Sequence, residues 1–210
     1  MTALNLSIDG IAEGQRIPEE FAFGVRTDSE PFTFGANISP AISWSGGPDD
    51  TKSYAIIMLD RSVPTVFDDA NQEGRVIPAD LARMDFMHWV LVDIAATTTS
   101  LPKGAESDAV VPKGKATGPA THGVRGANDF GMFMASNPDM AGDYGGYDGP
   151  APPWNDEIMH EYVFTVYALD VETLGMSGVF SGADALAAME GHVLASGQVV
   201  GEYTLNPDLT

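Results

Sequence analysis

The sequence has no cysteine and few basic residues. Its 210 residues include 10 lysine and arginine residues against 30 aspartate and glutamate residues, a formal net charge of −20 at pH 7. Without cysteine, the chain cannot form a disulfide, a thiolate metal site or a cysteine nucleophile. Without a basic stripe, so acidic a chain has no broad attraction to nucleic acid, and an anionic membrane surface repels it. We therefore expect neither nucleic-acid binding nor stable membrane association.

Long hydrophobic runs are missing too. No apolar segment approaches the roughly 20 residues that a membrane helix needs. A secretory signal is not expected, because the first basic residue is Arg16 and no long apolar segment accompanies it. These absences predict a soluble, cytoplasmic protein.

Hydrophobic residues make up 44% of the chain, and 23 glycines and 14 prolines are spread along it. The hydrophobic share is that of a globular protein. Scattered turn-forming residues indicate many short elements, as in a β-sandwich or a β-barrel. The sequence therefore predicts a mainly β fold in a single domain over residues 1–210.

Hydrophobic periodicity indicates where the strands lie. Leu4, Leu6 and Ile8 alternate with polar residues, as in a strand with one buried face. Continuous apolar runs of strand length are typical of central strands covered on both faces. Three such runs are Ser53–Leu59, Met87–Ile94 and His160–Leu169. Shorter strands are expected within residues 37–44 and at Gly197–Thr204.

One helix is predicted, over Ser181–Leu194. Ser181 can cap its N-terminus, and Leu186, Met189 and Val193 recur at helical spacing. By contrast, the stretches 61–86 and 95–159 are predicted to be irregular. A loop as long as the second is unusual in a compact domain unless it builds a functional site.

The candidate functional residues are polar side chains at the ends of predicted strands. Asp60 follows one apolar run, His88 lies near the start of another, and His160 begins a third. Strand alternation places Tyr162 on the same face as His160. Such residues also occur as ordinary structural groups, and the usual hydrolase, nucleotide and zinc motifs are missing. The pattern alone therefore predicts a polar cluster without defining its chemistry.

Several ordered segments match one family. They are Asp60–Pro64, His88–Val92, Gly126–Gly131, Gly146–Pro153, His160–Phe164 and Gly191–Ala195. The fourth reads G-x-x-G-P-x-P-P and the fifth H-x-Y-x-F, whereas the first matches the pattern D-P-D-x-P only loosely. The sequence thus resembles the phosphatidylethanolamine-binding protein family, specifically its bacterial Raf kinase inhibitor-like branch, from about residue 4 to residue 204.

The resemblance implies an antiparallel Greek-key β-sandwich of two sheets with peripheral helices. It also implies a small pocket that binds phosphate, acetate or phosphoryl head groups without a cofactor. The implied ligand-binding residues are Asp60, His88, Pro152, His160 and Tyr162. The imidazoles and the phenol would donate hydrogen bonds to ligand oxygens, while Asp60 orients a histidine. Regulation of a partner protein and a homodimer are further implications of the resemblance.

The chain departs from the family pattern beside the pocket. Arg61 and Ser62 replace a proline and an aspartate, and Glu161 replaces a residue that is often arginine. We expect the first two changes to remove a carboxylate from the pocket mouth and to add a cation there. Alternation places Glu161 on the side opposite His160. The extra residues 154–159, with the long 61–86 connection, would cover or reshape the mouth.

Two alternatives use the same residues. An enzyme would employ His160 or His88 as a general base, oriented by Asp60, on a phosphate ester or a small carbonyl compound. A metal site would use Asp60, His88 and His160 as a two-histidine, one-carboxylate ligand set. A binding protein with neither catalytic residues nor a metal is the leading interpretation, because no recognisable nucleophile motif is present.

Overall fold

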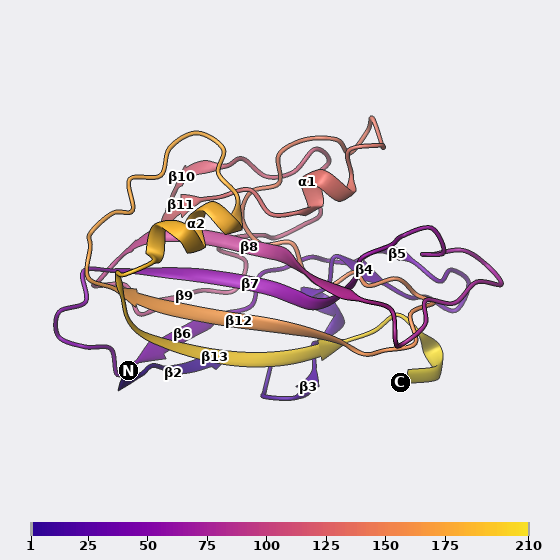
Figure 1. The fold of residues 1–210 in the computed structure, drawn as a ribbon, viewed down its shortest axis with the longest axis horizontal. Helices are drawn as coiled ribbons and strands as arrows, with labels where there is room; N and C mark the ends of the chain where they lie inside the picture. The colour runs from indigo at the N-terminus through magenta and orange to yellow at the C-terminus, as the bar shows by residue number, and fades with distance from the viewer. Residues whose placement is uncertain (1, 210) are drawn as a thin grey trace.

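The main sheet contains four long strands that run side by side across the molecule (Figure 1). The computed structural model describes residues 2–209, so Met1 and Thr210 of the predicted domain lie outside the described residues. The long strands, in spatial order, are β13 (Val193–Tyr203), β12 (His160–Leu169), β7 (Ser53–Pro64) and β8 (Arg83–Ala95). Neighbouring long strands are antiparallel. The predicted mainly β fold is confirmed.

Short strands extend this sheet at both edges. Beyond β8 lie β11 (Gly123–Arg125) and β10 (Gly118–Ala120), both antiparallel. At the other edge, β1 (Thr2–Ala3) and β3 (Gln15–Arg16) pair with β13 in parallel. The sheet is therefore antiparallel except where these two segments join β13.

A second sheet and a ribbon complete the β structure. The second sheet has the order β2 (Asn5–Ile8), β6 (Ile42–Ser45) and β9 (Ser100–Leu101). The ribbon pairs β4 (Gly24–Val25) with β5 (Thr33–Phe34). Two α-helices, α1 (Phe130–Phe133) and α2 (Gly182–Met189), and two 3-10 turns, η1 (Glu19–Phe21) and η2 (Pro207–Leu209), are peripheral. None of the described helices is long and apolar enough to cross a membrane.

The long strands are apolar throughout because both of their faces are covered. On β7, Ile56 and Met58 belong to the core shared with the second sheet, whereas Ala55 and Ile57 belong to the core beneath α2. Strand alternation separates the two sets, and no position in this run is left for a polar side chain. The central strands are thus where the apolar runs predicted them.

The helix α2 ends earlier than predicted. Ser181 caps it as expected, in a capping box in which its hydroxyl accepts from Asp184 N at 3.2 Å and the Asp184 carboxylate accepts from Ser181 N at 2.9 Å. The predicted end at Leu194 is wrong, because Gly191 has a φ of 82° and Val193 already pairs with Leu169 in the sheet. Strand pairing overrides the helical spacing of the last apolar residues.

Loss of this cap should destabilise the protein modestly. We expect Ser181→Ala to lower the free energy of unfolding by about 1 kcal/mol, because a helix donor loses its side-chain acceptor. Urea denaturation checks this value. Ser177→Ala is the control, since Ser177 is exposed and its hydroxyl makes no hydrogen bond to any residue in the described range 2–209. Equal losses in both variants would contradict the role of the cap.

The irregular stretches are shorter than predicted. Strand β7 continues to Pro64, and strand β8 already begins at Arg83, with register shifts between them near Asp60. Residues 65–82 alone therefore connect the two strands. Residues 96–159 contain the short elements already named and several deeply buried side chains, among them Tyr147 and Asp148. This long segment packs into the fold and builds one side of a pocket.

Candidate functional site

Four of the predicted site residues meet at one end of the main sheet. Tyr162 on β12 pairs with Asp60 on β7, and Asp60 pairs in turn with Phe86 on β8, two residues before His88. His160 is the first residue of β12. Because the strands are in this register, side chains from three strands converge, and all of them are buried.

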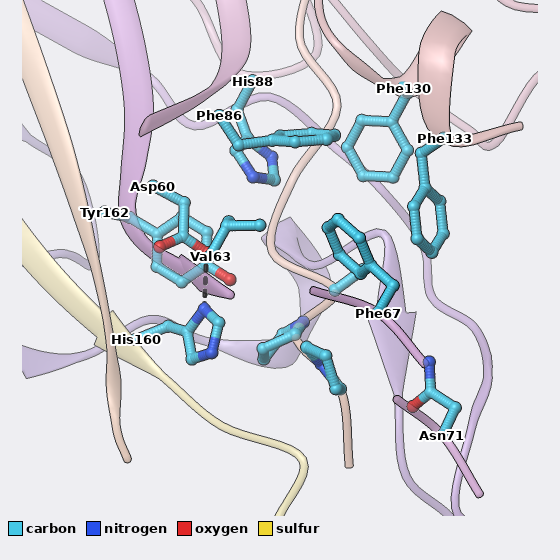
Figure 2. Close-up of a pocket in the computed structure, with 13 residues that line it drawn as sticks. Asp60, Val63, Phe67, Asn71, Phe86, His88, Phe130, Phe133, His160 and Tyr162 are labelled. Carbon is cyan, nitrogen blue, oxygen red and sulfur yellow. Dashed lines mark hydrogen bonds and ion pairs between the residues drawn. The ribbon is translucent and has the colours of Figure 1, made fainter. Parts of the chain in front are cut away.

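These side chains line a small cavity (Figure 2). Its volume is about 40 Å³, enough for a few water molecules. The five predicted residues all contribute to its wall: Asp60, His88, Pro152, His160 and Tyr162. The rest of the wall is mostly apolar, and is formed by Val63, Phe67, Asn71, Phe86, Phe130, Phe133, Ala151 and Pro153. The structure thus brings the five together, and their role in ligand binding stays a prediction.

His160 is held between two carboxylates. Its Nδ1 lies 2.7 Å from Asp60 Oδ2, and its Nε2 lies 3.1 Å from Asp156 Oδ2. Burial alone would lower the pKa of His160, but the charges and hydrogen bonds of Asp60 and Asp156 outweigh burial and raise the pKa to about 9. His160 is therefore an imidazolium at neutral pH, with both of its N–H groups donating to protein carboxylates.

This arrangement changes the role expected of His160. The orienting contact from Asp60 is present, but neither ring nitrogen is free to bond a ligand oxygen. A cation with a pKa of about 9 is a poor general base near neutral pH. The enzyme alternative built on His160 therefore finds no support in the geometry, and the group available as a base is His88.

Asp156 is the site residue that sequence reasoning missed. It is fully buried, and Arg83 from β8 holds it with two bonds, Nη1 to Oδ2 at 2.5 Å and Nη2 to Oδ1 at 3.0 Å. Burial raises the pKa of Asp156, but the hydrogen bonds from His160 and Arg83 outweigh this effect and the net shift is downward. The carboxylates of Asp60 and Asp156 are thus balanced by one imidazolium and one guanidinium.

His88 has a different environment. Its Nδ1 lies 2.7 Å from the carbonyl oxygen of Asp148, and its ring packs against Phe86, Phe130 and Tyr162. Burial lowers the pKa of His88, more than the nearby carboxylates raise it. His88 is therefore neutral, with its proton on Nδ1 because the carbonyl can only accept. Its Nε2 carries a lone pair and makes no hydrogen bond to any residue between 2 and 209.

A buried network fixes the carbonyl that orients His88. The Asp148 carboxylate accepts from Lys115 Nζ at 2.6 Å, from Asn37 Nδ2 at 2.8 Å and from Asn128 Nδ2 at 2.9 Å. The next residue, Gly149, passes so close to the main chain that a Cβ would lie 1.8 Å from the carbonyl oxygen of Phe21. The second glycine of the G-x-x-G-P segment is thus required, because no side chain fits between the two main chains.

Tyr162 presents an unsatisfied donor. Its hydroxyl is buried, and within residues 2–209 it has no hydrogen-bond partner of acceptable geometry. Burial raises the pKa of Tyr162 well above 10, and the negative charge of Asp60 adds to the shift. The Asp60 carboxylate and the backbone of Ala151 lie close enough to the hydroxyl to influence its pKa, but neither makes a well-formed hydrogen bond to it. The hydroxyl can therefore donate to a ligand or to water.

Two residues that depart from the family pattern, Arg61 and Glu161, form an ion pair. Arg61 Nε lies 2.5 Å from Glu161 Oε2, and both side chains are about half exposed. The cation expected at the pocket mouth is therefore neutralised at the surface, and Arg61 is not part of the cavity wall. Ser62 is buried, and its hydroxyl accepts from Glu161 N at 3.1 Å. The expected gain of a positive charge at the mouth is wrong.

The loop of residues 65–82 covers one side of the mouth, and it contributes Phe67 and Asn71 to the wall. Asn155 holds this loop, because its Oδ1 accepts from Asn71 N at 2.9 Å and its Nδ2 donates to two loop carbonyls at 2.8 and 3.0 Å. The extra residues 154–159 thus shape the mouth, as predicted.

The metal alternative does not fit the hydrogen bonds. Both nitrogens of His160 bond carboxylates, and Nδ1 of His88 bonds a carbonyl. Within residues 2–209, no three His, Cys, Asp or Glu side chains are arranged to hold a metal ion. The set Asp60, His88 and His160 is therefore arranged as hydrogen-bonded side chains.

Comparisons with known proteins identify similar chains and a similar fold. Residues 7–204 match the family described as phosphatidylethanolamine-binding protein. A UPF0098 protein from Methanothermobacter thermautotrophicus is 30% identical over 95% of this chain and 98% of its own. The UPF0098 protein YbhB of Escherichia coli is 29% identical over 96% of this chain and all of its own. The crystal structure of E. coli YbcL, described as a new member of the mammalian PEBP family, superposes with a TM-score of 0.68 at 26% identity, covering 96% of this chain and 98% of that one.

Proposed function

Because this chain belongs to the phosphatidylethanolamine-binding protein family, we propose that its pocket binds one small oxygen anion, such as phosphate or the phosphoryl part of a head group. The protein acts as a binding protein, without a catalytic step. The observation that carries the proposal is a pair of unused polar groups in one cavity, the Tyr162 hydroxyl and the His88 Nε2.

The charge balance of the site permits an anion. Asp60 and Asp156 are each bonded to a cationic partner, so neither carboxylate is left to repel the ligand. The cavity of about 40 Å³ suits a group with few heavy atoms. Apolar walls around a few placed polar groups are typical of ligand sites.

The two unused groups call for a protonated oxyanion. Tyr162 can donate to a ligand oxygen, but the neutral His88 Nε2 can only accept, so the ligand must supply a hydrogen there. A hydrogen phosphate satisfies both groups through one P–O and one P–OH. Alternatively, His88 takes up a proton as the anion enters. Only the second route takes up a proton, since hydrogen phosphate carries its P–OH throughout the range from pH 8 to 6. An affinity that rises as the pH falls over this range would therefore identify protonation of His88 on binding.

Titration calorimetry with inorganic phosphate tests the proposal. We expect Tyr162→Phe and His88→Ala each to weaken phosphate binding about tenfold, since each removes a hydrogen bond to a charged ligand. The control is His192→Ala, because His192 is partly exposed and bonds Asp170 far from the cavity wall. Absence of phosphate binding, or unchanged affinity in both pocket variants, would refute the proposal. Regulation of a partner by the liganded form stays a prediction.

A further inference from the structure

Two arginines of this acidic chain have no carboxylate partner. The sequence contains six arginines. Four of them form ion pairs with aspartate or glutamate, at positions 61, 75, 83 and 125. Within residues 2–209, Arg16 and Arg26 form none. Both line one hollow of about 420 Å³, the arginine hollow, whose wall shares no residue with the wall of the pocket described above.

The fold fixes the place of both arginines. Arg16 ends β3, its guanidinium lies 5.1 Å from the centre of the Tyr203 ring, and its Nη2 donates to Thr204 O at 3.3 Å. The Tyr203 hydroxyl donates to Gly24 O at 3.1 Å, and Arg26 directly follows β4. The same tyrosine therefore supports one arginine and ties down the strand that leads to the other.

Two carboxylates line the arginine hollow as well. Glu19 belongs to η1, and Asp28 belongs to the turn after Arg26. Hydrogen bonds close this turn, from Thr27 N to Glu30 O and from Glu30 N to Thr27 Oγ1, both at 3.0 Å. In the described range 2–209, neither carboxylate accepts a hydrogen bond or forms an ion pair. Two cations and two anions thus line one hollow without bonding each other.

This arrangement suits a ligand that carries both charges. Guanidinium groups bind a carboxylate through paired N–H donors, and carboxylates accept the N–H groups of an ammonium ion. A simple anion would meet the two carboxylates of the wall, and a simple cation would meet the two guanidinium groups. A zwitterion satisfies both sets. Because it has no net charge, the charge of −20 on the protein does not repel it.

We propose that the arginine hollow is a second ligand site, which binds a small zwitterion with one carboxylate and one ammonium group. Arg16 and Arg26 bind the carboxylate, and Glu19 and Asp28 bind the ammonium. The site is independent of the proposed anion pocket, because the two walls have no residue in common.

Titration of the full-length protein, followed by NMR, tests this site with zwitterions of increasing charge separation. The probes are glycine, 4-aminobutyrate and 6-aminohexanoate, each compared with the simple carboxylic acid and the simple amine of the same chain length. We expect at least one zwitterion to bind about tenfold tighter than both of its singly charged analogues, since it gains a second set of charged hydrogen bonds.

Variants assign the binding to the hollow. Arg26→Gln and Asp28→Asn should each weaken binding of the best zwitterion about tenfold. Both residues are exposed, so the variants should fold. Arg61→Gln and Asp139→Asn are the matched controls, because both residues are exposed and lie outside the hollow. Phosphate binding in the other pocket should be unchanged in all four variants.

The outcomes keep the two sites apart. Equal binding of a zwitterion and its simple acid at every length would show that the carboxylates take no part, and would overturn the inference. Affinity that is insensitive to Arg26→Gln would overturn it too. Zwitterion binding that is lost in Tyr162→Phe would place the ligand in the anion pocket and reject a second site. If no zwitterion binds, the inference fails, while the proposal for phosphate is unaffected.

Discussion

Replacing Asp156 with alanine should lower the free energy of unfolding by about 3–5 kcal/mol, the range seen when one partner of a buried ion pair is removed. Asp156 is fully buried and accepts two hydrogen bonds from Arg83 and one from His160. Without it, the guanidinium loses its carboxylate and the imidazolium keeps only Asp60. The measurement is urea denaturation at pH 7, followed by tryptophan fluorescence.

The chain offers a matched control for this variant. Asp170 also bonds a histidine, His192, at 2.8 Å, but both side chains of that pair are more than 40% exposed. Asp170→Ala should therefore change the free energy of unfolding by less than about 1 kcal/mol. If Asp156→Ala leaves too little folded protein, Asp156→Asn keeps the side-chain shape and should show a smaller loss. Similar losses in the Asp156 and Asp170 variants would contradict the structural role of the buried cluster.

Raising the pH from 6 to 9 should lower the free energy of unfolding by about 3 kcal/mol through His160 alone. Its pKa is about 9 in the folded protein, against an ordinary value of 6.5. Because the folded-state value is the higher one, the imidazolium contributes fully below pH 6.5. The contribution is lost as the pH rises through 9. The pH range of the experiment ends at 9, because tyrosines of the unfolded chain begin to ionise near pH 10 and would add their own pH dependence.

Urea denaturation at several pH values measures this loss, and two variants assign it. His160→Gln removes the titrating group, so its stability should fall much less than that of the wild type over the same range. His192→Gln should retain the full pH dependence, because it leaves the buried cluster intact. A wild-type stability that is flat between pH 7 and 9 would show that the imidazolium is not held as the geometry indicates.

Local patterns were enough to predict the long strands and the pocket histidines. The run from Ser53 needs both faces covered, and that requirement places β7 in the sheet centre without knowledge of its neighbours. His160 and Tyr162 share a face by alternation alone, His88 was marked by its place at the start of an apolar run, and the matched segments added Pro152. These features depend on residues close together in the chain, and a sequence pattern is enough to predict them.

The partners of these residues could not be predicted in the same way. Arg83 lies in a stretch predicted to be irregular and reaches a carboxylate 73 positions away. Lys115 and Asn37 lie far from Asp148 in sequence, and no periodicity marks them as buried. Which hydrogen bond each histidine makes depends on tertiary contacts. The sequence therefore predicted the two imidazoles in one pocket, but not that one is a saturated cation and the other a neutral acceptor.

The short parallel segments beside β13 have a consequence for self-association. An edge strand presents a row of free backbone groups to which another chain can add as a further strand. Here Leu4 N bonds Ser196 O, Gly14 N bonds Val200 O and Ile17 N bonds Glu202 O. At the opposite edge, β10 has three residues, and Pro119 at its centre has no N–H to offer. One margin of the large sheet is thus covered by short segments of the chain, and the other ends in a short strand with a central proline. Both features disfavour edge-to-edge aggregation.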